Sequence, residues 1–372
     1  MSEVYLCLKC WLQTPASELT YLCPACGQQP VAQNPVLGRV AGLRKVKQAK
    51  RGLRRLSSVQ LHDVRCPRHP ELLQSFRCEC TAEIRPDAAI KTGPGSTLGI
   101  GIVGSSGVGK TLMMLSALHD MREANGVHLL GIGDTDVRFA GLYEEFFSGG
   151  IRPKLTRPGD TGGFGWRARS PGDADVGDRL LLMNDLPGQF WSGEELKGDM
   201  PAARFMELLH KIVLVLDGAG IAADLGLPTT DAWNQEPRVP TRGFKDSALL
   251  GNLLNNLGEH RIRNMDLAIA VSKGDLLWEH DRWAPLLESS RNGGSSRVNS
   301  AVLELLEASG RSGLLTYASK FRHCEPFAFS SLGFRPDESH LDSANGSVLK
   351  QSPTPIGAAA PIRWLLDPEP RA

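Results

Sequence analysis

The feature that most constrains this chain is the stretch 98–112, which reads LGIGIVGSSGVGKTL. Its apolar first part, residues 98–103, is typical of a buried strand, and residues 112–123 are typical of a helix. Between them, residues 104–111 match the pattern G-x-x-x-x-G-K-[ST] at every fixed position. Three glycines in this short segment allow backbone N–H groups to turn inward around an anion. The stretch therefore predicts a phosphate-binding P-loop.

Each position of the predicted loop has a mechanical role. The loop consists of Gly104, Ser105, Ser106, Gly107, Val108, Gly109, Lys110 and Thr111. In a P-loop the lysine reaches the terminal phosphates of a nucleoside triphosphate, and the following hydroxyl ligates Mg²⁺. Lys110 and Thr111 hold these positions, and the positive end of the next helix faces the anion. We therefore expect a bound nucleotide and Mg²⁺.

Seven of the eight cysteines precede residue 81, in closely spaced pairs that favour metal binding over disulfides in a reducing compartment. We expect one Zn²⁺ site from Cys7, Cys10, Cys23 and Cys26, and a second from Cys66, His69, Cys78 and Cys80. Four protein ligands leave no open position for a catalytic water, so both predicted sites are structural.

A basic segment separates the two halves of the zinc-binding region. Residues 39–55 contain no acidic residue and eight basic ones, which are Arg39, Arg44, Lys45, Lys47, Lys50, Arg51, Arg54 and Arg55. Such a segment could contact the phosphates of a nucleic acid, but a solvated surface is the commoner explanation. No aromatic residue lies among the charges to stack on a base, so nucleic-acid binding is not favoured. We expect an unidentified protein partner instead.

The remaining pattern indicates two domains. Residues 1–90 form the predicted zinc-stabilised module. In residues 91–372, strand-like and helix-like runs alternate, which predicts an α/β domain with a mostly parallel sheet covered by helices on both faces. Residues near 218–247 are rich in Gly, Pro and Thr and are interpreted as a surface insert, and residues near 333–355 as a flexible connector.

Composition limits the class of protein further. Hydrophobic residues make up 41% of the chain and charged residues 22%, as in ordinary globular proteins. No run reaches the roughly 18 apolar residues of a membrane span, and residues 1–10 do not resemble a signal peptide. We therefore expect a cytoplasmic protein, while the sequence leaves its oligomeric state open.

Two further motifs follow the predicted P-loop, Asp-Leu-Pro-Gly-Gln at residues 185–189 and Ser-Lys-Gly-Asp at residues 272–275. With all three motifs in this order, the chain resembles the translation-factor-like and Ras-like GTPases. An extra helix expected before the loop 149–163, the insert and the terminal segment 361–366 also look like the bacterial double-GTPase group, which is thought to act in multi-protein conflict systems. The resemblance implies a switch that binds GTP or GDP with Mg²⁺ and hydrolyses GTP.

The resemblance assigns roles to the residues of the second motif. Asp185 would hold Mg²⁺ together with Thr111, and the Gly188 N–H would contact the γ-phosphate. Gln189 would orient the attacking water. The switch threonine that completes the Mg²⁺ shell would lie in the loop 149–163, where both Thr156 and Thr161 qualify.

The third motif resembles the base-reading pattern [NT]-K-x-D, with Ser272 in place of the first residue. Asp275 would accept hydrogen bonds from the guanine N1–H and the N2 amine, which adenine does not offer, while Lys273 would lie over the base. Ser331 lies where the family has a loop over the guanine oxygen.

Two alternatives remain open at this point. Residues 212–216 form an apolar run that ends in Asp217, as the Mg²⁺-binding strand of a P-loop ATPase would. Asp185 is favoured because Gly188 and Gln189 accompany it. The other alternative is an adaptor that binds nucleotide for stability alone, without turnover.

Overall fold

The computed structural model describes those parts of the chain whose placement is defined. They are residues 4–15, 20–23, 27–33, 75–78, 83–84, 89–90, 97–123, 128–151, 163–169, 179–185, 201–227, 229, 243–277, 280–283, 296–336 and 348–366.

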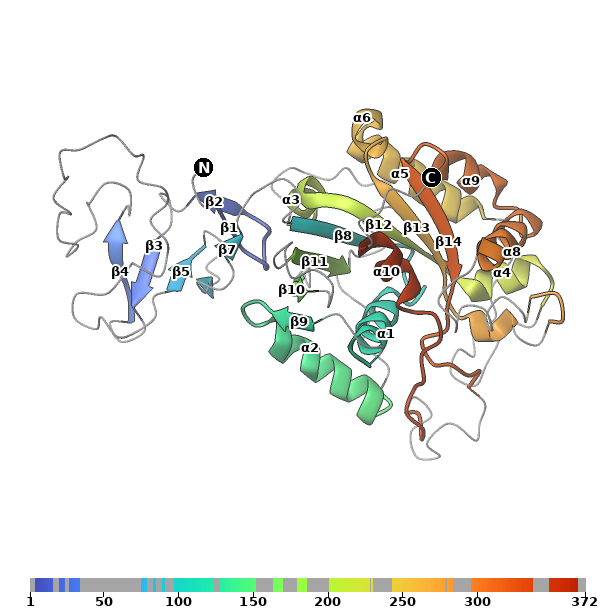
Figure 1. The fold of residues 1–372 in the computed structure, drawn as a ribbon, viewed down its shortest axis with the longest axis horizontal. Coiled ribbons are helices and arrows are strands. Elements are labelled where there is room, and N and C mark those ends of the chain that lie inside the picture. The colour runs from blue at the N-terminus through green and yellow to red at the C-terminus, as the bar shows by residue number, and fades with distance from the viewer. Residues whose placement is uncertain are drawn as a thin grey trace.

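A seven-stranded sheet forms the centre of the molecule (Figure 1), with the strand order β14-β13-β12-β8-β11-β10-β9. The strands are β8 (Thr97–Val103), β9 (His128–Gly131), β10 (Phe164–Arg169), β11 (Arg179–Asp185), β12 (Leu209–Leu216), β13 (Asp266–Val271) and β14 (His323–Ala328). Only β10 runs antiparallel to its neighbours. The predicted mostly parallel α/β sheet is confirmed.

Alternating side chains of the central strands contribute to two separate hydrophobic clusters, one on each face of the sheet. In β12, Ile212 and Leu214 belong to one cluster, while Val213 and Val215 belong to the other. Such alternation is the expected consequence of the two-residue period of a strand. Because both faces are buried, the strands read as continuous apolar runs rather than as alternating ones.

Helices cover both faces, as the sequence predicts. The first face packs against α3 (Pro201–Leu208), α4 (Gly218–Asp224), α5 (Phe244–Leu257), α6 (Glu259–Ile262), α8 (Ser296–Ala308) and α9 (Ser312–Ala318). The second packs against α1 (Lys110–Glu123), α2 (Thr135–Tyr143), η4 (Glu144–Ser148) and α10 (Ala360–Leu366). No helix in the described ranges is long and apolar enough to cross a membrane.

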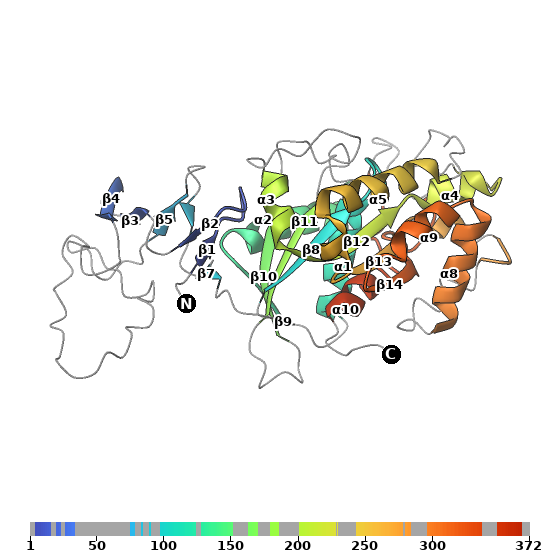
Figure 2. The same cartoon turned by 90° about the horizontal axis from the view of Figure 1, so that it is seen from above.

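The N-terminal region forms two small antiparallel sheets. One has the order β2-β1-β7 and consists of β1 (Val4–Leu6), β2 (Gln13–Pro15) and β7 (Ala89–Ile90). The other has the order β4-β3-β5-β6 and consists of β3 (Thr20–Cys23), β4 (Gly27–Gln33), β5 (Ser75–Arg77) and β6 (Glu83–Ile84). In Figure 2, β1, β2 and β7 lie beside the α3 and β10 end of the central sheet. The basic segment 39–55 lies outside the described residues.

Two predictions about irregular segments are wrong in part. Residues 218–224 are not a surface insert but helix α4, whose Ile221 and Ala222 are fully buried. The predicted flexible connector is held by backbone N–H groups in both of its described parts. The Gly333 N–H donates to the Ser330 hydroxyl, the Leu349 N–H to Gly150 O and the Thr354 N–H to Leu332 O. Small residues in α4 and backbone pairing in the connector produce little hydrophobic periodicity, which is why the sequence pattern missed them.

A buried ion cluster joins α4, α5 and the start of α9. The Arg311 guanidinium, almost fully buried, lies 2.9 Å from an Asp224 carboxylate oxygen and 2.9 Å from one of Asp246.

We predict that Arg311→Ala lowers the free energy of unfolding by about 3 to 5 kcal/mol, because two buried carboxylates lose their counter-ion. Urea unfolding measures this loss. Arg263→Ala, which breaks an exposed pair with Glu259, is the control and should change stability far less.

Candidate functional site

The segment between β8 and α1 has the backbone that its glycines permit. Gly107 and Gly109 adopt positive φ angles of 76° and 94°. A Cβ atom on Gly104 would lie 2.5 Å from the Val215 carbonyl oxygen, so only glycine lets this turn approach β12 so closely. The conformation of the turn after β8 therefore explains why the sequence motif has glycine at these positions.

The Lys110 side chain folds back over this segment. Its ammonium nitrogen donates to the carbonyl oxygens of Gly104 and Ser105, at 3.0 Å each, and the residue is buried. A positive charge is therefore held at the turn beside the N-terminal end of the 14-residue helix α1. Helix dipole and ammonium together favour an anion at this position.

Ser272 connects the end of β13 to the turn. Its buried hydroxyl oxygen lies 2.7 Å from the Val108 carbonyl oxygen and 2.9 Å from that of Leu216. The single hydroxyl proton is donated to one carbonyl or shared between the two. The serine therefore ties residues 272–275 to the predicted phosphate loop, across 164 positions of the sequence.

Asp275 is held by a residue from another loop. Its carboxylate oxygen Oδ1 accepts a hydrogen bond from the Ser330 hydroxyl at 2.7 Å, and the Ser330 hydroxyl accepts from the Gly333 N–H at 2.9 Å. The role predicted for the neighbouring Ser331, over a guanine oxygen, stays a prediction. The Ser331 carbonyl oxygen accepts a hydrogen bond from the Ser116 hydroxyl.

Lys273 and Asp217 form an ion pair between the ends of two neighbouring strands. The Lys273 ammonium lies 2.9 Å from Oδ1 of Asp217, and both side chains are mostly buried. Asp217 also caps α4, where its side chain accepts from the Ala219 N–H at 3.3 Å. Lys273 adopts a positive φ of 51°, an unfavourable conformation for a residue with a side chain.

These groups meet at one edge of the sheet. The parallel strands β8, β11, β12 and β13 all end there, and β8 lies between β11 and β12. The main chain of Asp185, the last residue of β11, pairs with Ile102 of β8. The carboxyl edge of a parallel sheet is where α/β proteins commonly bind ligands. The Asp185 side chain and the predicted residues Thr156, Thr161, Gly188 and Gln189 lie outside the described part.

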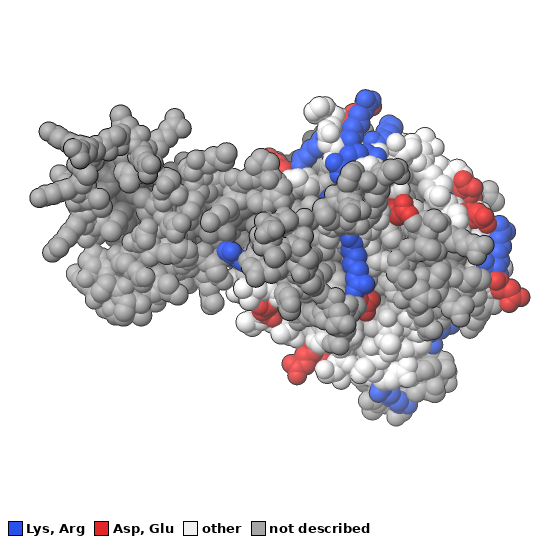
Figure 3. Space-filling model, viewed as in Figure 1, with Lys and Arg blue, Asp and Glu red and all other residues white. Residues whose placement is uncertain are grey.

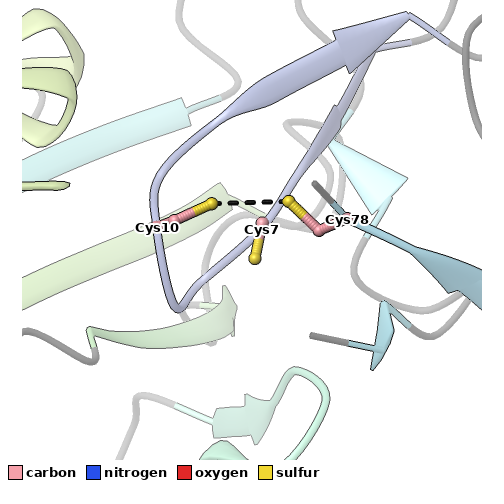
Figure 4. A group of neighbouring side chains, drawn as sticks. All are labelled: Cys7, Cys10 and Cys78. Atoms are coloured by element: carbon pink, nitrogen blue, oxygen red, sulfur yellow. Dashed lines mark hydrogen bonds between the residues drawn. The ribbon is translucent and has the colours of Figure 1, made fainter. Parts of the chain in front are cut away.

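A cluster of three buried cysteines lies in the N-terminal region. The sulfur atoms of Cys7, Cys10 and Cys78 are all within 4.8 Å of one another. Cys10 Sγ and Cys78 Sγ point toward each other at 3.4 Å (Figure 4), well beyond the roughly 2.05 Å of a disulfide. Four Zn–S bonds of about 2.3 Å in a tetrahedron place sulfurs about 3.8 Å apart, so the spacing suits one metal ion.

A divalent cation would let the three sulfurs bind as thiolates. Hydrogen bonds with the Cys10 and Cys78 side chains, and then burial, raise the pKa of the Cys7 thiol well above its ordinary value. Buried sulfurs this close repel one another once ionised, and a divalent cation removes that repulsion. The donor set therefore fits Zn²⁺.

The grouping of the cysteines differs from the predicted one. The sequence analysis assigned Cys78 to the second site, whereas the structure brings it to Cys7 and Cys10. A four-coordinate ion has one place left, so it cannot also take both Cys23 and Cys26. Thr20 pairs with Arg77 in the β3/β5 ladder, which puts Cys23 roughly 13 Å along the strand direction from Cys78.

The other predicted zinc ligands are not tested by the described residues. Cys26, Cys66, His69 and Cys80, and the side chain of Cys23, lie outside them. Sequence spacing alone could not show that Cys78 returns to the first pair, because the antiparallel pairing of β3 with β5 and of β1 with β7 sets this arrangement.

Neither a protein-family model nor a curated protein sequence matches this chain.

We predict that Ser272→Ala lowers the free energy of unfolding by about 1 to 3 kcal/mol, because the buried carbonyl oxygens of Val108 and Leu216 lose a donor. Urea titration measures the change. Ser319→Ala removes an exposed hydroxyl with one local contact and should stay within about 0.5 kcal/mol of the parent protein. Equal effects of the two substitutions would show that the Ser272 contact is energetically unimportant.

Proposed function

We propose that the protein is a Mg²⁺-dependent switch that binds and hydrolyses GTP. The observation that carries this proposal is the attachment of residues 272–275 to the turn after β8. Ser272 bonds to Val108 of that turn, and Asp275 is held by Ser330. A site that recognises a base and binds phosphates requires these two segments at a fixed separation. The Ser272 hydroxyl connects them.

The proposed base reader is the Asp275 carboxylate. A carboxylate that accepts from both the guanine N1–H and the N2 amine distinguishes guanine from adenine, which has no donor at either position. The Ser330 hydroxyl fixes the orientation of the Asp275 carboxylate, because it donates a hydrogen bond to Oδ1. A positioned acceptor loses less entropy on binding than a freely rotating one.

The proposed phosphate and metal groups lie along the same edge. Lys110 and the backbone N–H groups of residues 104–109 would bind the β- and γ-phosphates, while Thr111 and Asp185 would hold Mg²⁺. Bound Mg²⁺ supplies charge neutralisation on the phosphates. Gly188, Gln189 and either Thr156 or Thr161 keep the roles that the resemblance implies, as predictions.

An ATPase that uses Asp217 as its metal-binding acid is the second candidate, since β12 also lies next to β8. Against it, Asp217 is paired with Lys273 and caps α4. Recruiting this carboxylate to Mg²⁺ would leave a mostly buried ammonium without its partner, which is costly. We therefore favour Asp185 for the metal.

The N-terminal region is proposed to hold two Zn²⁺ ions and to recruit a protein partner. A role in a bacterial conflict system rests on the resemblance alone. On the face shown in Figure 3, acidic and basic side chains are interspersed among the described residues. Binding of nucleic acid through the segment 39–55 stays a prediction.

The base assignment is tested by Asp275→Asn. The asparagine amide has one acceptor and one donor group, so it no longer accepts from both the N1–H and the N2 amine of guanine. It instead matches xanthine, which offers the N1–H as a donor and the 2-oxygen as an acceptor. We therefore expect GTP to bind about a hundredfold more weakly and XTP to bind more tightly. Isothermal titration calorimetry in Mg²⁺ measures both. Asp281→Asn, an exposed neighbour, is the matched control and should change neither. Unchanged GTP affinity in Asp275→Asn would contradict the assignment.

The hydrolytic role is tested separately by Gln189→Ala. If this glutamine orients the attacking water, the single-turnover rate of GTP hydrolysis should fall by about tenfold or more with little change in GTP affinity. A chain without measurable turnover that still binds GTP tightly would favour the adaptor alternative.

A further inference from the structure

The turn that carries the first two cysteines packs directly on the α/β domain. Trp11 is buried, and its ring centroid lies 4.5 Å from that of Phe205 in α3. The Gly163 N–H donates to the Leu8 carbonyl oxygen at 3.1 Å. Trp11, Cys7 and Cys10 belong to the same hydrophobic cluster as the helices on that face of the sheet. The cysteine turn is therefore part of the domain core.

Trp11 contacts the domain at two informative positions. Gly163 ends the loop 149–163, in which the switch threonine is predicted, and a Cβ atom there would lie 1.7 Å from the Trp11 ring. Phe205 belongs to α3, the first described element after the predicted motif 185–189. One aromatic ring thus lies between the last residue of the loop that is predicted to hold the switch threonine and the first described helix after the predicted motif 185–189.

Trp11 occupies its position in an unfavourable conformation. Its φ is 59°, in the left-handed region. In the second C-x-x-C pair the equivalent residue after the last cysteine is Gly27. Glycine is the residue type that can adopt a positive φ without strain. A bulky side chain in this conformation persists only where surrounding contacts determine it. Here those contacts are the cysteine cluster on one side and Gly163 with Phe205 on the other.

We propose that Cys7, Cys10 and Cys78 bind one Zn²⁺ ion that holds Trp11 between Gly163 and Phe205, and thereby couples zinc binding to nucleotide binding. The nucleotide half of this proposal rests on the proposed function. The zinc half rests on the cysteine cluster and on the packing of Trp11.

The coupling follows from the geometry. Zinc fixes the turn of residues 7–10 to Cys78, and this fixed turn presents Trp11 to Gly163 and Phe205. Thiol hydrogen bonds such as the 3.4 Å contact between Cys10 and Cys78 are weaker than Zn–S bonds, so without the ion the strained tryptophan is held less firmly. A nucleotide that favours the arrangement of Gly163 and Phe205 around Trp11 then also favours the zinc-loaded form, and linkage makes the effect reciprocal.

The ligand set is tested by counting zinc in the purified full-length chain. We expect Cys10→Ser and Cys78→Ser each to lose one equivalent of zinc relative to the parent. Cys324→Ser is the matched control, because Cys324 lies on β14 outside the cluster, and it should lose none. Unchanged zinc content in Cys10→Ser and Cys78→Ser would overturn the metal site.

The coupling is tested with variants that keep every cysteine. Trp11→Ala and Gly163→Ala should retain the parental zinc content but weaken GDP affinity about fivefold or more, measured with a fluorescent GDP in Mg²⁺. Trp364→Ala, on α10, is the control and should leave GDP affinity unchanged. In the parent protein, saturating GDP should raise the affinity for zinc, measured by competition with a chromogenic chelator that does not bind Mg²⁺. The expected increase in zinc affinity equals the increase in GDP affinity that bound zinc causes.

The outcomes separate this inference from the proposed function. Parental GDP affinity in both Trp11→Ala and Gly163→Ala would overturn the coupling while leaving the GTPase proposal intact. If the parent binds no guanine nucleotide, the proposed function fails and the coupling with it, whereas the zinc counts still decide the ligand set.

Discussion

The hydrogen bond from the Ser272 hydroxyl to the Val108 carbonyl is the contact on which the candidate site depends. It joins the end of β13 to the turn after β8, two segments that belong to non-adjacent strands of one parallel sheet. Lys110 closes the turn from the other side, and Ser330 holds Asp275 at the far end. Serine replaces the asparagine or threonine of the family pattern, yet its hydroxyl reaches the loop. The substitution therefore does not by itself argue against guanine recognition.

Much of the fold was predictable because its signals are local. The apolar run of β8, the glycines of the turn and the alternation of strands with helices are all visible over short windows of sequence. The long-range contacts were not predictable. Ser330 contacts Asp275, Lys273 pairs with Asp217, and Cys78 joins Cys7, because tertiary packing and strand register bring together residues far apart in the chain. Helix α4 was missed because its glycines and alanines are weak signals in sequence although they are buried in the fold.

The N-terminal region is more closely tied to the α/β domain than a boundary near residue 90 suggests. Trp11 packs on Phe205 and excludes any side chain at Gly163, so the cysteine turn and the domain share one core. A metal bound by the three sulfurs would then stabilise the domain as well as the small sheets around it. A zinc ion bound there would be linked through Trp11 to Gly163 and Phe205.

The central claim is that the edge of the sheet formed by β8, β11, β12 and β13 binds a guanine nucleotide. The most direct test is equilibrium binding of GTP, GDP and ATP to the purified full-length chain in Mg²⁺, with Lys110→Ala to remove the phosphate contact. We expect a preference for guanine of about a hundredfold, or about 2.7 kcal/mol, and loss of binding in Lys110→Ala. Equal affinities, or a preference for ATP, would contradict it and would point to Asp217 as the metal-binding acid.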